Sequence, residues 1–96
     1  MTHDDFWDLY DSGKISVKVY SGVVDGVEKE IEAFEFGGKF FLRIHFVDDY
    51  VKTTRVRGVK KRYAMQSRSD FIKEFDNKGS ANRYFKKASV GLTRIL

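Results

Sequence analysis

The feature that most constrains this fold is an alternation of apolar and polar residues, interrupted by dipeptides that favour tight turns. Residues 14–21 alternate in this way, so every second side chain, beginning with Ile15, lies on one face of a strand. Asp25-Gly26 comes next, and this dipeptide favours the two-residue turn of a β-hairpin. Residues 27–36 then form the returning strand, which predicts an antiparallel hairpin.

The returning strand changes its pattern partway along. The glutamates of 28–32 share one face, and Phe34 and Phe36 then occupy that same face. A β-bulge near Ala33 would produce such a change, and so would a strand that passes from one layer of the fold into another.

Residues 39–47 form the clearest strand, directly after a second tight-turn dipeptide, Gly37-Gly38. One face is wholly apolar and carries Phe40, Leu42, Ile44 and Phe46. The other face is mixed and carries Phe41, Arg43, His45 and Val47. We expect a central strand that ends in a turn at Asp48-Asp49. Residues 50–66 then read as one bent polar strand, or as two short strands broken at Gly58.

Three short segments favour helices. Residues 2–13 begin with a capping pattern, because Thr2 is followed three residues later by Asp5. A second helix is expected to begin at Ser67 or Ser69. Its buried face would carry Phe71, Ile72 and Phe75. A third is expected to begin at Ser80, and its buried face would carry Tyr84, Phe85 and Ala88.

These elements predict one α+β domain over residues 1–96. It has a short N-terminal helix, an antiparallel β-meander of four strands (five if 50–66 is broken in two) and two C-terminal helices packed on the sheet. We expect the three helices to cover one face of the sheet, which gives a two-layer arrangement.

The residue inventory excludes several classes of chemistry. The chain has no cysteine, which excludes a disulfide scaffold, a cysteine-ligated zinc site and a thiol nucleophile. Its two histidines, His3 and His45, have no second ligand at metal-binding spacing. No phosphate loop or nucleophile elbow is present. We therefore expect a non-enzymatic protein with no cofactor, metal or small-molecule substrate. The acidic start of the chain lacks a signal-peptide pattern and no run is long enough to span a membrane, so we expect a cytoplasmic protein.

The charges of the chain divide sharply between its halves. Residues 1–49 hold 11 acids and 5 bases, a net charge of −6, whereas residues 50–96 hold 3 acids and 13 bases, a net charge of +10. Such asymmetry points to an anionic partner. The expected binding residues are Lys52, Arg55, Arg57, Lys60, Lys61, Arg62, Tyr63 and Arg68. A β-ribbon with a basic turn can grip a phosphate backbone, and flanking tyrosines can stack on bases.

Other interpretations of the charges stay open. Phe41, Arg43 and His45 could form a stacking platform for single-stranded RNA on an open sheet. The glutamates of 28–32 could instead neutralise the basic run across the sheet. A third possibility is that the acids form a surface that imitates nucleic acid and binds a basic protein.

In its small size, compactness and bipolar charge, the chain is similar to the accessory proteins with which phages and mobile elements inhibit host machinery, anti-CRISPR proteins among them. This resemblance implies a partner that is a nucleic-acid-processing protein or a nucleoprotein complex. The leading expectation is an inhibitor of a CRISPR nuclease that competes with guide RNA or target DNA through the basic face. The alternative is a direct DNA- or RNA-binding protein, and a third reading is a structural subunit with an obligate protein partner.

Overall fold

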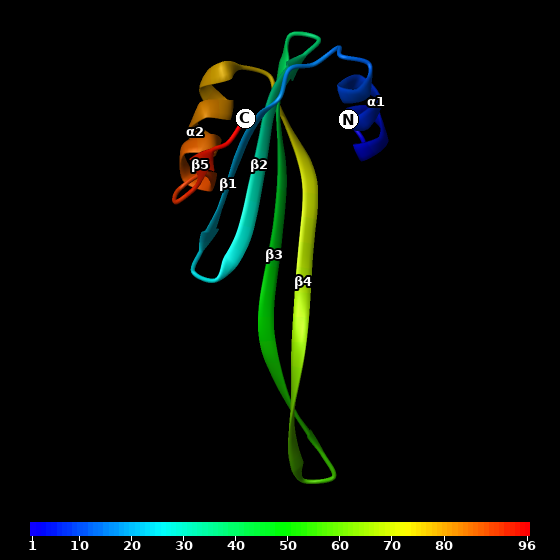
Figure 1. Ribbon diagram of the computed structural model, residues 1–96, viewed down its shortest axis with the longest axis vertical. Helices are drawn as coiled ribbons and strands as arrows, with labels where there is room; N and C mark the ends of the chain where they lie inside the picture. The colour runs from blue at the N-terminus through cyan, green and yellow to red at the C-terminus, as the bar shows by residue number, and fades with distance from the viewer.

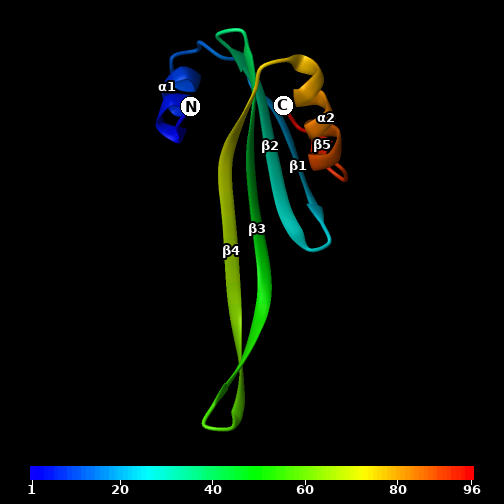
Figure 2. The same cartoon turned by 180° about the vertical axis from the view of Figure 1, so that it is seen from behind.

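The computed structural model is a five-stranded antiparallel sheet with one helix on each face (Figures 1 and 2). In chain order the elements are α1 (His3–Asp11), β1 (Lys18–Val24), β2 (Val27–Phe36), β3 (Lys39–Val56), β4 (Val59–Phe75), α2 (Lys78–Ala88) and β5 (Thr93–Arg94). The strand order is β4-β3-β2-β1-β5. The structure describes residues 1–47, 55, 57–62 and 68–96 in full, and for the others only the strand in which they lie. The expected α+β class with an antiparallel sheet is confirmed.

Helix α1 begins at the expected cap and covers one face of the sheet. The Asp5 amide donates to Thr2 Oγ1 at 3.1 Å, and the Thr2 amide donates to Asp5 Oδ2 at 3.0 Å. This reciprocal pair satisfies two amides that the helix itself leaves unpaired. Phe6 is then fully buried against Phe34 and Phe41 of the sheet. A nine-residue helix is marginal in isolation, so this apolar docking is what stabilises α1.

Helix α2 covers the opposite face of the sheet, so the expected two-layer arrangement is wrong (Figure 1). Ile31, Leu42 and Ile44 form the core there, with Phe85 of α2 packed on them. The pattern change in β2 has the same cause. The register of β2 is continuous from Ile31 to Phe34, so no bulge causes the change. The change occurs because helices cover both faces of β2, and both faces therefore need apolar residues.

The expected second helix is instead part of strand β4, and the structure has one C-terminal helix. Phe71 and Phe75 face the α2 side, whereas Ile72 packs beneath α1. Apolar residues at these three positions fit one side of a helix, but they also fit a strand that is covered on both faces. Pairing with β3 along the whole strand gives the backbone its hydrogen bonds and decides between the two.

Strands β3 and β4 continue beyond the rest of the molecule as an antiparallel pair (Figure 1). The last pair between β2 and β3 is Glu28 with Val47, and β3 runs nine residues further to Val56. The turn expected at Asp48-Asp49 therefore lies at Arg57-Gly58. At about 3.3 Å per residue this extension is about 30 Å long, in a molecule of 57 × 27 × 23 Å. We call residues 48–67 the arm and the remainder the head.

Candidate nucleic-acid interface

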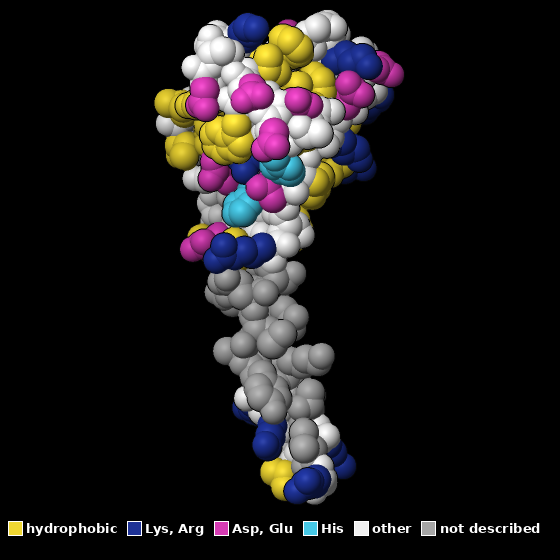
Figure 3. All heavy atoms as spheres, turned by 90° about the vertical axis from the view of Figure 1, so that its right-hand side faces the viewer, with side chains coloured by type: hydrophobic (Ala, Val, Ile, Leu, Met, Phe, Trp, Pro, Cys, Tyr) yellow, Lys and Arg dark blue, Asp and Glu magenta, His cyan; other side chains and the backbone are white. Residues whose placement is uncertain are grey.

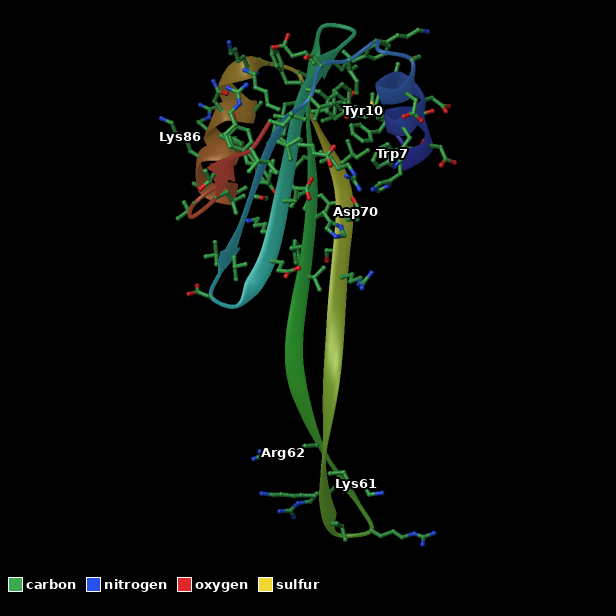
Figure 4. The ribbon with its side chains drawn as sticks, viewed as in Figure 1. Trp7, Tyr10, Lys61, Arg62, Asp70 and Lys86 are labelled. Carbon is green, nitrogen blue, oxygen red and sulfur yellow. The ribbon has the colours of Figure 1, made fainter. Side chains whose placement is uncertain are left out.

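Five basic residues gather at the far end of the arm. They are Arg55, Arg57, Lys60, Lys61 and Arg62, and all five are exposed. Figure 3 shows this end as a group of Lys and Arg side chains, and Figure 4 labels Lys61 and Arg62 there. Arg57 and Gly58 form the turn with φ of +52° and +77°, which is the left-handed geometry of a two-residue hairpin turn. We call these five residues the arm tip.

The charges of the arm tip are distributed around the ribbon. Arg55 lies directly opposite Lys60, and Arg62 follows two residues later on the same face. Lys61 points to the other face, and Arg57 lies in the turn. Like charges directly opposite each other on a sheet are destabilising. These cations therefore do not stabilise the hairpin, and a bound anion would relieve their repulsion.

The glutamates of 28–32 are not the partners of the arm tip. Glu28, Glu30 and Glu32 lie opposite Val47, His45 and Arg43, all in the head. Among the fully described residues, the nearest acid along β4 is Asp70, which is eight residues or about 26 Å from Arg62. The Debye length is about 8 Å at physiological ionic strength, so the head acids are screened from the tip.

Three other residues of the expected basic site are not part of the arm tip. Arg68 is exposed in β4, opposite Val47, where the arm joins the head. The side chains of Lys52 and Tyr63 lie outside the described residues.

The mixed face of β3 is not an open platform, because α1 covers it. Phe41 is buried and stacks on Phe34, with ring centroids 5.1 Å apart. Arg43 is held by two carboxylates: Nη1 lies 2.6 Å from Glu32 Oε1, and Nη2 lies 2.8 Å from Asp70 Oδ2. Its guanidinium also lies 5.4 Å from the ring centroid of Phe6 and 5.3 Å from that of Trp7, both in α1. Of the expected platform, His45 is the most exposed residue, with 37% of its side chain accessible against 13% for Arg43.

A cluster of charged residues surrounds Arg43. Two of its members, His3 and Asp70, are not among the site residues expected from the sequence. His3 Nε2 lies 2.8 Å from Asp70 Oδ1, where a ring N–H donates to the carboxylate, and His45 Nδ1 lies 3.6 Å from Asp70 Oδ2. His45 Nδ1 and Arg43 Nε are buried without a hydrogen-bond partner. Because residue 70 was expected in a helix, its position beside residues 3 and 43 had no signal in the sequence.

The two carboxylates that hold Arg43 have pKa values shifted in opposite directions. Burial raises the pKa of Glu32 and outweighs the attraction of Arg43. Burial also acts to raise the pKa of Asp70, but the hydrogen bonds from His3 and Arg43 outweigh it and the net shift is downward. Through the contact of His3 with Asp70 and of Arg43 with the α1 rings, the cluster connects α1 to the sheet. In the fully described part of the chain, no three His, Asp or Glu side chains are arranged to hold a metal ion.

A pocket of about 420 Å³ lies in the head, away from the arm. Its lining includes the apolar residues Phe34, Phe40, Leu42 and Phe85 together with the lysines Lys14, Lys18 and Lys78. The arm tip and this pocket share no residue, so the pocket is not part of the basic interface.

Comparison with known proteins gives no match: no family model, curated protein or solved structure resembles this chain. Helices α1 and α2, the two helices described, are both too short to cross a bilayer.

Proposed function

We propose that this chain is a non-enzymatic nucleic-acid-binding module that contacts the phosphate backbone with the arm tip. The observation that supports this function is the position of five exposed cations at the end of an arm about 30 Å long. None of them forms an ion pair with a described acid.

The physical basis of this binding is counter-ion release. A cation that neutralises a phosphate frees condensed salt ions, so the logarithm of the affinity falls linearly with the logarithm of salt concentration. The slope is about 0.9 per phosphate contact for duplex DNA. The arm also carries its charges away from the acidic head, so the tip can approach a polyanion without bringing the head acids close to it (Figure 3).

The test is fluorescence anisotropy with mixed-sequence DNA and RNA oligonucleotides over a series of salt concentrations. Replacing Arg55, Lys60 and Arg62 with Gln should weaken binding at least tenfold and reduce the salt slope by about 2 to 3. The matched control replaces Lys78, Lys86 and Lys87 of α2 with Gln, which removes the same charge from the head. Binding that is absent, that does not depend on salt, or that weakens equally in the control would contradict the function.

A second candidate function follows from the resemblance to phage inhibitors. In it, the chain inhibits a CRISPR nuclease, and the arm competes with guide RNA or target DNA for the nuclease. The observation that favours it is a separate surface on α1, where Trp7 and Tyr10 are more than two-fifths exposed beside the aspartates Asp4, Asp8 and Asp11. Such a surface gives the head its own contact with a protein. Cleavage assays with a panel of nucleases test it, with the arm-tip variant as control. No inhibition across the panel would exclude this candidate and leave direct nucleic-acid binding intact.

A further inference from the structure

The width of the arm restricts which nucleic acid it can enter. Beyond Val47, β3 pairs only with β4, and both helices pack on the head, so the outer arm is a ribbon two strands wide (Figures 1 and 2). The major groove of B-form DNA, about 12 Å wide, admits a two-stranded ribbon. The undistorted minor groove of B-form DNA, about 6 Å wide, is narrower than such a ribbon, which enters it only where the DNA is bent and the groove opened. The major groove of A-form RNA is too narrow for side chains to read.

The position of the cations fits insertion better than surface contact. A ribbon that lies flat on a phosphate backbone needs its cations on one face. In the arm tip, Arg55, Lys60 and Arg62 are on one face, but Lys61 is on the other and Arg57 is in the turn. A groove presents phosphates along both walls, so a ribbon inside it can use cations on both faces.

The turn gives the arm tip a narrow leading end. Arg57-Gly58 connects the two strands with two residues, and both have positive φ. Arg57 is exposed at this end, where its guanidinium can reach the floor of a groove. Arginine is the side chain that most often contacts guanine in the major groove, through its O6 and N7 atoms.

The acids of the head limit how far the contact extends. Glu28 and Glu30 lie in β2 just above the arm, and Asp70 lies beside His45. Phosphates that approached these carboxylates would be repelled. The contact is therefore confined to the arm tip, and five cations set an upper limit of about 4.5 on the salt slope with duplex DNA.

From this width, charge distribution and turn, we propose that the ligand of the arm is B-form duplex DNA and that the arm tip enters its major groove. This inference rests on the proposed function and names the nucleic acid that the same site binds.

The experiment measures anisotropy with a 20-base-pair DNA duplex, the RNA duplex of the same sequence and the corresponding single strands. We expect the DNA duplex to bind at least tenfold more tightly than the others. Methyl green, which occupies the major groove, should compete, whereas netropsin, which occupies the minor groove, should not. Equal or tighter binding of RNA or of single strands, or displacement by netropsin, would overturn this inference and leave the proposed function standing. Absence of binding to all four would overturn both.

Two variants test insertion itself. Lys61→Gln and Arg62→Gln each remove one charge, from opposite faces of the ribbon. Insertion predicts that both weaken binding several-fold, whereas flat docking predicts a loss for only one of them. Arg57→Asn gives a third measurement, because Asn-Gly favours the same turn and only the cation is lost. It should also weaken binding several-fold, and unchanged affinity would contradict a leading role for the turn.

Discussion

Arg43 connects four elements at the centre of the molecule. It joins Glu32 of β2 to Asp70 of β4, and its guanidinium lies against Phe6 and Trp7 of α1. Only 13% of its side chain and 11% of that of Glu32 are exposed, so the ion pair between them is shielded from water and salt. Removing the cation takes away the ion-pair partner of Glu32 and leaves Asp70 with its contacts to His3 and His45. The position of α1 on the sheet therefore depends on this residue.

We expect Arg43→Met to lower the free energy of unfolding by about 3 kcal/mol, because breaking a buried ion pair leaves uncompensated charge. Urea denaturation measures this. The control is Lys39→Met, which breaks a pair with Glu74 of 3.4 Å between half-exposed side chains and should cost less than about 1 kcal/mol. Adding Glu32→Gln to Arg43→Met should recover part of the loss. Equal effects of Arg43→Met and Lys39→Met would show that the cluster is not structural.

The opposite pKa shifts of Glu32 and Asp70 predict opposite pH dependences. The raised pKa of Glu32 means that its contribution to stability is present at low pH and is lost as pH rises through its folded value, above about 4.3. The lowered pKa of Asp70 means that its contribution is present above about pH 4 and is lost as pH falls through its folded value.

Urea midpoints measured from pH 2.5 to 7 separate the two groups. Asp70→Asn should flatten the loss of stability below about pH 4, and Glu32→Gln should flatten the loss above about pH 4.3. If both variants flatten the same side of the profile, the assignment of the two shifts is wrong.

At the scale of elements, local turn chemistry was the most informative part of the sequence. Asp25-Gly26 and Gly37-Gly38 both lie at turns, and the strand between them has the expected bounds. The turn predicted at Asp48-Asp49 is wrong: aspartate is common in turns, but the residues with the φ values of a hairpin turn are Arg57 and Gly58. In the sequence, Gly58 indicates only a break in the strand, so the sequence does not predict the length of the arm.

The helix expected near Ser69 shows where local patterns are insufficient. Asp70, Ile72 and Glu74 face α1, and Phe71 and Phe75 face α2, so the apolar spacing fits either structure. Pairing with the distant strand β3 decides between helix and strand, and no local pattern in the sequence identifies that partner. The same error concealed the contact of Asp70 with Arg43. The basic residues of the arm were recognised from the sequence, whereas their separation from the acids required the strand register.

The arm can be removed without disturbing the head, because neither core cluster of described residues contains an arm residue. Val47 and Arg68 are cross-strand neighbours, so an Asn-Gly turn can join them in place of residues 48–67. We expect unfolding to stay cooperative, with a free energy within about 1 kcal/mol of the parent, and nucleic-acid binding to be lost. Calorimetry measures the unfolding, and anisotropy measures the nucleic-acid binding. Retained binding would place the interface on the head.

At the scale of the whole molecule, the division of charge along the sequence becomes a separation in space. The acidic half of the chain contributes α1 and most of the sheet face beneath it, whereas the arm tip is basic (Figure 3). The two surfaces lie toward opposite ends of a molecule 57 Å long. The total charge of +4 therefore describes neither surface.

This separation makes the influence of the head on binding depend on salt. Replacing Asp4, Asp8 and Asp11 with Asn removes three negative charges from exposed positions of α1 and leaves the Asp5 cap intact. The Debye length is about 8 Å at 0.15 M salt and about 30 Å at 0.01 M. Affinity for duplex DNA should therefore change less than twofold at 0.15 M and rise several-fold at 0.01 M. Anisotropy at both salt concentrations measures this. An equal rise at both would mean that α1 itself lies against the nucleic acid, because only short-range repulsion survives screening at 0.15 M.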